Sequence, residues 1–229
     1  MQKIILIMLS ALPLFARFFP PTVHTTVASA SSNGTDIKLK RPFPINGMSG
    51  IVIHHYGNDL KAITGYITQV SSSGIGKLVA KEIIHHEKLP TIKTSISKGD
   101  KIIGGYLYNN ILLLAPNANT YTKITKAVSK KWIHPDLFAA FLSELGEGYP
   151  TKANLALFAK QYQVGLIYII KKNSAVLLDP ISGKIVGKKA FHNTSQKTQF
   201  PFFMHFDEIQ SGWFSNSTSK DYYKTMEQF

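Results

Sequence analysis

The chain has 229 residues, of which 44% are hydrophobic and 17% are charged, a composition typical of a folded globular protein rather than a disordered one. It contains no cysteine, which excludes disulfide bonds, thiol nucleophiles, cysteine-type zinc sites and lipidation of a cysteine within this chain. The formal net charge is +13, from 26 basic and 13 acidic residues, and it favours anionic partners.

The first thirty residues are predicted to be a secretory signal peptide. Lys3 supplies a positive charge, and residues 4–15 form an apolar stretch that is shorter than the roughly 20 residues of a membrane span. Ala28-Ser29-Ala30 has the small residues behind which signal peptidase cleaves, and Leu14-Phe15-Ala16 is an alternative exit. We therefore expect export to the periplasm or the cell surface, with a mature chain from Ser31. An uncleaved anchor is the alternative interpretation.

Residues 31–46 are polar and contain proline, which predicts a flexible linker. Residues 47–116 predict a β-rich subdomain, because short runs of β-branched and aromatic residues alternate with turns such as residues 71–76. Five short strands with tight turns indicate a small barrel or a curled antiparallel sheet. The expected strands cover residues 50–56, 62–70, 77–84, 102–108 and 111–115.

Residues 117–229 are predicted to form an α/β subdomain, because the hydrophobic period changes from two to about 3.6. His134-Pro135-Asp136 is expected to begin one helix, and Thr151 to cap the next. Residues 165–170 are apolar on both faces and predict a central strand. Further expected elements are a short helix with Tyr121, Ile124 and Val128 on one face, a hairpin around residues 179–183 and a C-terminal helix over residues 220–229. The whole chain thus predicts an α+β fold, in which a β-rich half is followed by a helical segment packed on a strand and hairpin.

Two histidine pairs are candidate metal ligands: His54-His55, and His85-His86 followed by Glu87. Neighbours on a strand point to opposite faces, so a single pair does not easily hold one metal ion. One histidine from each pair together with Glu87 could do so, but no further ligand has a recognisable spacing. We prefer the interpretation as ordinary strand histidines, and we expect no metal and no cofactor.

Motifs of enzymatic chemistry are weak. Residues 73–77, Ser-Gly-Ile-Gly-Lys, faintly resemble a phosphate loop, but they lack its first glycine and lead into a strand, so a hairpin is predicted. No serine lies in a GxSxG setting. Glu144 and Glu147 are interpreted as solvated charges rather than a pair of catalytic carboxylates. We therefore expect no enzymatic activity.

The best candidate for a binding surface is the basic stretch Lys123, Lys126, Lys130 and Lys131. The first three are spaced three and four apart, on one side of the predicted helix. A solvated helix face is the alternative interpretation. Beyond residue 30, Arg41 is the only arginine, and because base reading relies on arginine we expect no sequence-specific nucleic-acid recognition.

Several stretches together carry a family resemblance. They are Lys98-Gly-Asp100, Asn109-Asn-Ile-Leu-Leu-Leu-Ala-Pro-Asn117, Ile133-His-Pro-Asp-Leu-Phe-Ala-Ala-Phe-Leu142, residues 158–168, residues 201–203 and residues 214–223. In this order they resemble the N-terminal domain of the plasminogen-binding protein A family of Helicobacter, Campylobacter and their relatives. The resemblance implies a periplasmic or surface-exposed protein whose better-known relatives capture host plasminogen.

The resemblance also implies a difference in plasminogen binding. Those relatives carry a long tail rich in lysine and glutamate and end in lysine, which presents an ammonium and a carboxylate together to plasminogen's kringles. This sequence ends at Phe229, and Lys220 and Lys224 are internal, so we expect plasminogen binding to be weakened or lost. The preferred hypothesis is a non-catalytic envelope module with a protein partner, plasminogen among the candidates, and with contacts to envelope components. The alternative is a structural accessory part of an envelope machine such as a flagellar basal-body ring.

Overall fold

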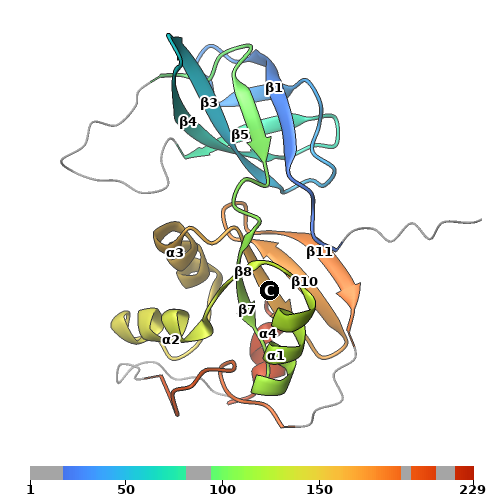
Figure 1. Cartoon of the computed structure of the whole chain (residues 1–229), viewed down its shortest axis with the longest axis vertical. Coiled ribbons are helices and arrows are strands. Elements are labelled where there is room, and N and C mark those ends of the chain that lie inside the picture. Colours follow the sequence, from blue (N-terminus) through green and yellow to red (C-terminus); the bar gives the residue numbers. More distant parts are fainter. Residues whose placement is uncertain (1–17, 81–93, 192–196, 210–219) are drawn as a thin grey trace, which may run out of the picture.

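The computed structural model describes residues 18–80, 94–191, 197–209 and 220–229. Two β-sheets follow one another along the long axis of the molecule (Figure 1). The first is a closed barrel of strand order β1-β2-β5-β4-β3-β6, and the second is a five-stranded sheet of order β11-β10-β9-β7-β8. The described helices lie beside the second sheet, and none of them is long and apolar enough to cross a membrane. The predicted α+β class, with a β-rich first half, is confirmed.

The barrel is antiparallel throughout, and β1 closes it by pairing with β2 on one side and with β6 on the other. Apolar side chains, including Val27, Val52, Ile67 and Ile102, are buried in its core. Its strands are β1 (Val23–Ala30), β2 (Asp36–Leu39), β3 (Ser49–Gly57), β4 (Leu60–Gln69), β5 (Ile75–Ala80) and β6 (Lys101–Gly104).

The structure corrects the predicted boundaries of the first half. β1 occupies residues assigned to the signal peptide over 1–30, and β2 lies in the linker predicted over residues 31–46. Both strands bury only some of their side chains, and the polar and small residues between the apolar ones conceal the strand pattern. The subdomain predicted over residues 47–116 therefore starts earlier, and its last predicted strand, residues 111–115, belongs to the second sheet. Residues 81–84 of the strand predicted over 77–84 lie outside the described residues.

The second sheet is organised around β9, which lies between the antiparallel strand β10 and the parallel strand β7. Every residue of β9 is buried, so the prediction of a central strand is confirmed. The hairpin predicted around residues 179–183 joins β10 to β11. The strands are β7 (Asn110–Leu114), β8 (Lys131–Ile133), β9 (Leu166–Ile170), β10 (Ser174–Asp179) and β11 (Lys184–Ala190).

The helices begin where the side chains can cap them. Thr151 and Asn154 form a capping box at the third helix, and His134 accepts a hydrogen bond from the backbone of Asp136 at the second. The second, third and fourth helices pack with one face of the sheet in a core that includes Phe138, whereas the first helix contributes to the core on the other face. They are α1 (Ala118–Ala127), α2 (Pro135–Glu144), α3 (Lys152–Tyr162) and α4 (Tyr222–Met226).

A buried carboxylate joins the barrel to the second sheet. Asp179, the last residue of β10, is fully buried. Its Oδ2 accepts hydrogen bonds from the amide of Ser49 (2.9 Å) and the hydroxyl of Tyr108 (2.6 Å), and its Oδ1 accepts them from the amides of Ile181 (2.9 Å) and Ser182 (3.0 Å). Burial raises the pKa of Asp179, and these hydrogen bonds offset the rise only in part. Because Ser49 begins β3, this network fixes the barrel against the end of β10.

Candidate functional site

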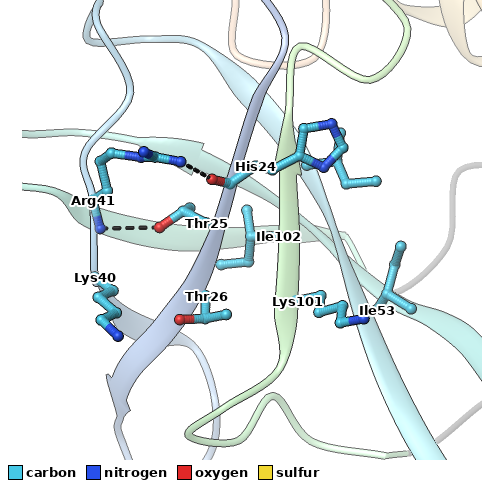
Figure 2. Close-up of a pocket in the computed structure, with 9 residues that line it drawn as sticks. His24, Thr25, Thr26, Lys40, Arg41, Ile53, Lys101 and Ile102 are labelled. Atoms are coloured by element: carbon cyan, nitrogen blue, oxygen red, sulfur yellow. Dashed lines mark hydrogen bonds between the residues drawn. The ribbon is translucent and has the colours of Figure 1, made fainter.

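An open hollow with a volume of about 800 Å³ lies against β1 of the barrel (Figure 2). Its lining combines apolar side chains, hydroxyls and cationic groups, and none of the lining residues is acidic. They are His24, Thr25, Thr26, Lys40, Arg41, Ile53, Lys101, Ile102 and Ile103. We refer to this site as the barrel hollow.

The register of three neighbouring strands assembles the centre of the barrel hollow. Thr26 of β1 lies opposite Lys101 of β6, and Lys101 lies opposite Ile53 of β3. The adjacent position pairs Thr25 with Ile102. Because paired residues on adjacent strands project to the same side of a sheet, a hydroxyl, an ammonium and an aliphatic side chain lie next to one another.

The chain that follows β2 supplies the opposite side of the barrel hollow. The amide of Lys40 donates to the carbonyl of Thr26 (2.9 Å), and the amide of Arg41 donates to the hydroxyl of Thr25 (2.9 Å). The guanidinium of Arg41 donates to the carbonyl of His24 (2.5 Å), which holds its side chain along β1. Figure 2 shows Lys40 and Arg41 on one side of β1 and Lys101 on the other.

The charge of the barrel hollow is uncompensated. Lys40, Arg41 and Lys101 are exposed, and none of them has a carboxylate partner within the described part of the chain. Guanidinium and ammonium groups beside hydroxyls bind carboxylates and phosphates through charge-assisted hydrogen bonds. Ile53 and Ile103, which are partly exposed, add an apolar surface suited to the carbon skeleton of a ligand. The geometry therefore favours an anionic group attached to a partly apolar molecule.

The structure separates the four lysines of the predicted binding surface. Lys123 and Lys126 are exposed on α1, as expected for either interpretation. The expectation that Lys130 shares their helix face is wrong, because α1 ends at Ala127. The ammonium of Lys130 turns inward, 3.4 Å from the carbonyl of Tyr108, and burial lowers its pKa. Lys131 is exposed at the start of β8, away from the helix.

Other side chains singled out in the sequence have ordinary surroundings where they are described. His54 pairs with the buried Asp100 (2.7 Å between Nδ1 and Oδ1). Residues 85–87, with the second histidine pair and Glu87, lie outside the described residues. Residues 71–76 connect β4 to β5, which confirms the hairpin, and Glu144 is exposed at the end of α2.

Sequence reasoning missed the barrel hollow because its cationic residues come from two segments that are about 60 residues apart, Lys40-Arg41 after β2 and Lys101 in β6. The register of β1 with β6 brings them together, and that register is not visible in the sequence. A signal was present in Val23–Ala30, where β-branched residues recur as in a strand. The small residues at the end of this segment also fit a cleavage site, and that interpretation concealed the strand.

Comparisons with known proteins give a consistent result. Residues 22–229 match the family model described as plasminogen-binding protein pgbA N-terminal. Two curated relatives, both described as plasminogen-binding protein PgbA, come from Helicobacter pylori strains J99 and 26695. Each is 32% identical over 153 residues, covering 64% of this chain and 33% of the relative. This chain thus matches about a third of the length of those relatives. No solved structure matches it.

Proposed function

We propose a function for this chain, which belongs to the plasminogen-binding protein pgbA N-terminal family. It is an exported, non-catalytic envelope module that binds an acidic segment of a protein partner. The barrel hollow is the proposed binding site. The observation that carries this proposal is the convergence of Lys40, Arg41 and Lys101 around an open hollow whose lining contains no acid.

Export is part of the proposal, and the position of β1 changes the proposed cleavage site. Cleavage behind Ala30 would remove a strand that pairs with both of its neighbours in the barrel. Cleavage behind Ala16 would leave β1 intact. The rings of Phe18 and Phe19 pack against Tyr168, with centroids 5.1 and 5.9 Å away, so packed structure begins soon after that point. We therefore favour the alternative exit, Leu14-Phe15-Ala16.

Plasminogen is the candidate partner because the relatives are named for binding it. The matched part is about a third of each relative, so the proposal requires that this part contributes contacts of its own. Lys40 and Lys101 are suited to this role because their ammonium groups are exposed and have no carboxylate partner among the described residues. Plasminogen binding by this part would then depend on internal lysines.

The test is binding of the chain from Arg17 to Phe229 to immobilised plasminogen, with and without a free lysine analogue. We expect saturable binding that the analogue abolishes. The double variant Lys40→Ala/Lys101→Ala should weaken binding by about tenfold, equivalent to ~1.4 kcal/mol. The matched control is Lys123→Ala/Lys126→Ala, which removes the same charge from α1 and should leave the affinity unchanged.

The outcomes separate the hypotheses. Equal weakening by the two double variants would mean that net charge, and not the barrel hollow, drives association. No binding by any variant would exclude plasminogen as the partner. If the chain does not bind plasminogen but forms closed-ring oligomers in sedimentation experiments, the accessory-ring alternative would be favoured.

A further inference from the structure

Three potential metal ligands lie together at the start of α2, and none of them lines the barrel hollow. His134 and Asp136 flank Pro135, and His205 reaches them from a segment 69 residues beyond Asp136. The Oδ2 atom of Asp136 lies 2.9 Å from Nδ1 of His205 and 3.3 Å from Nδ1 of His134. One ligand atom from each of the three side chains lies within 4.8 Å of the others. We refer to these residues as the histidine–aspartate cluster.

The hydrogen bonds within the cluster leave acceptor atoms facing each other. Nδ1 of His134 accepts the backbone N–H of Asp136 (3.2 Å) as the cap of α2, so it carries a lone pair and no proton in this arrangement. The same Nδ1 lies 3.3 Å from the carboxylate Oδ2, which is also an acceptor. An imidazole nitrogen beside a carboxylate oxygen places two potential metal ligands next to each other. The local geometry therefore favours a positively charged ligand.

The surrounding contacts fix the orientation of all three side chains. The backbone N–H of His205 donates to Oδ1 of Asp136 (2.9 Å), which turns Oδ2 toward the imidazoles. The rings of His134 and His205 stack with centroids 5.0 Å apart and an angle of 13° between their planes. The ring of Phe203 contacts both imidazoles, with centroid distances of 6.5 and 5.3 Å. Such outer contacts orient the ligands in metal sites.

The three side chains are accessible to an ion from solvent. The side chains of His134, Asp136 and His205 are 38%, 25% and 66% exposed, so an ion can enter from solvent.

We propose that the histidine–aspartate cluster binds one divalent transition-metal ion, such as Zn²⁺, through one ring nitrogen of each histidine and Oδ2 of Asp136. In a tetrahedral zinc site with bonds of about 2.0–2.2 Å, neighbouring ligand atoms are roughly 3.3–3.6 Å apart. Here Oδ2 of Asp136 lies 2.9 and 3.3 Å from the two Nδ1 atoms, and the three ligand atoms lie within 4.8 Å of one another, so small side-chain rotations would complete the site. Imidazole nitrogen and carboxylate oxygen are a ligand set that zinc accepts. The ion would tie the segment around His205 to the first turn of α2, and a fourth position would remain open to water or to a partner's side chain.

The test is calorimetric titration of the full chain with Zn²⁺, on protein without a polyhistidine tag. We expect one equivalent of Zn²⁺ to bind and to raise the thermal unfolding midpoint, because binding to the folded state stabilises it. The variants His205→Ala and Asp136→Asn should weaken binding by roughly tenfold or more. Asp136→Asn keeps the shape of the side chain, so it tests the site even where His205→Ala perturbs the segment.

The matched control is His55→Ala, which removes an exposed histidine of β3 and should leave both binding and the thermal shift unchanged. Unaltered binding in His205→Ala and Asp136→Asn would overturn the proposal. Binding that is lost only in His85→Ala/His86→Ala would assign the metal to that pair and would also overturn it. So would the absence of heat at about 100 µM Zn²⁺, a concentration that fills a site of micromolar affinity.

Discussion

The barrel and the second sheet bury their apolar residues in different ways. In the second sheet, β9 is buried along its whole length, because side chains pack against both of its faces. In the barrel, β1 is buried only toward the interior, and its outward positions are partly or fully exposed. The second sheet is therefore committed to the core of the protein, whereas the barrel wall has positions free for cationic side chains. The proposed binding site lies on this partly exposed barrel wall.

The largest expected effect comes from removing β1. A chain that begins at Ser31 lacks the strand that closes the barrel between β2 and β6, so backbone hydrogen-bonding groups and the barrel core would be exposed. We expect a loss comparable with the whole stability of a typical domain, about 5–15 kcal/mol. Two-dimensional NMR spectra should show a folded chain from Arg17 and no dispersed barrel signals in the chain from Ser31. Equal dispersion and equal thermal midpoints would contradict the barrel assignment of β1.

The next largest effect is expected at the junction of the two regions. The carboxylate of Asp179 accepts hydrogen bonds from four donors. In Asp179→Asn, the side-chain NH₂ group is itself a donor, so it would face some of these donors without an acceptor between them. We expect the free energy of unfolding to fall by about 3 kcal/mol, measured by urea denaturation. The control is Asp59→Asn, an exposed change in a turn that should remain within about 0.5 kcal/mol of wild type. A similar midpoint for both variants would mean that the network does not hold the regions together.

A smaller effect distinguishes two glycines, one in each region. A methyl group at Gly165, just before β9, would lie 2.1 Å from the carbonyl oxygen of Leu107, which is backbone and cannot rotate away. A methyl group at Gly104 in the barrel would lie 2.4 Å from the ring of Phe43, a side chain that can shift. We expect Gly165→Ala to destabilise by ~2–3 kcal/mol and Gly104→Ala by less. Thermal unfolding of both variants would measure the order, and the reverse order would refute this explanation.

The smallest effect is the pH dependence of the junction. The pKa of Asp179 is raised in the folded state, mainly by burial, so the folded protein binds this proton more tightly than the unfolded chain. The contribution of Asp179 to stability therefore increases as pH falls from neutral toward the carboxyl's ordinary pKa, and it decreases as pH rises. The difference in unfolding free energy between wild type and Asp179→Asn should widen over that interval. A difference that is constant with pH would show that the carboxyl does not titrate there.

The second sheet could be predicted almost element by element because its signals are local. Thr151 caps α3 with its own side chain, His134-Pro135-Asp136 begins α2, and residues 165–170 are apolar without interruption. Such patterns depend on neighbours within a few residues. The barrel's first two strands lack this advantage, because half of their positions face solvent and carry polar or small residues.

The candidate sites could not be predicted because they depend on tertiary structure. Lys101 and Arg41 line the same hollow, on opposite sides of β1, only when β1 pairs with β6 and the chain after β2 runs beside it. His205 meets Asp136 only when residues 69 apart in the sequence pack together. The predicted lysine surface failed at Lys130 for a local reason, since α1 ends before that residue and its side chain turns toward Tyr108.

The most direct test of the proposed function is to observe where plasminogen binds. Amide chemical shifts of the isotope-labelled chain from Arg17 to Phe229 would be followed as plasminogen is added. The proposal predicts that signals of Thr25, Thr26, Arg41 and Lys101 shift or broaden first and that those of α1 do not. Changes confined to Lys123, Lys126 and their neighbours would contradict the assignment of binding to the barrel hollow and would return the interface to α1.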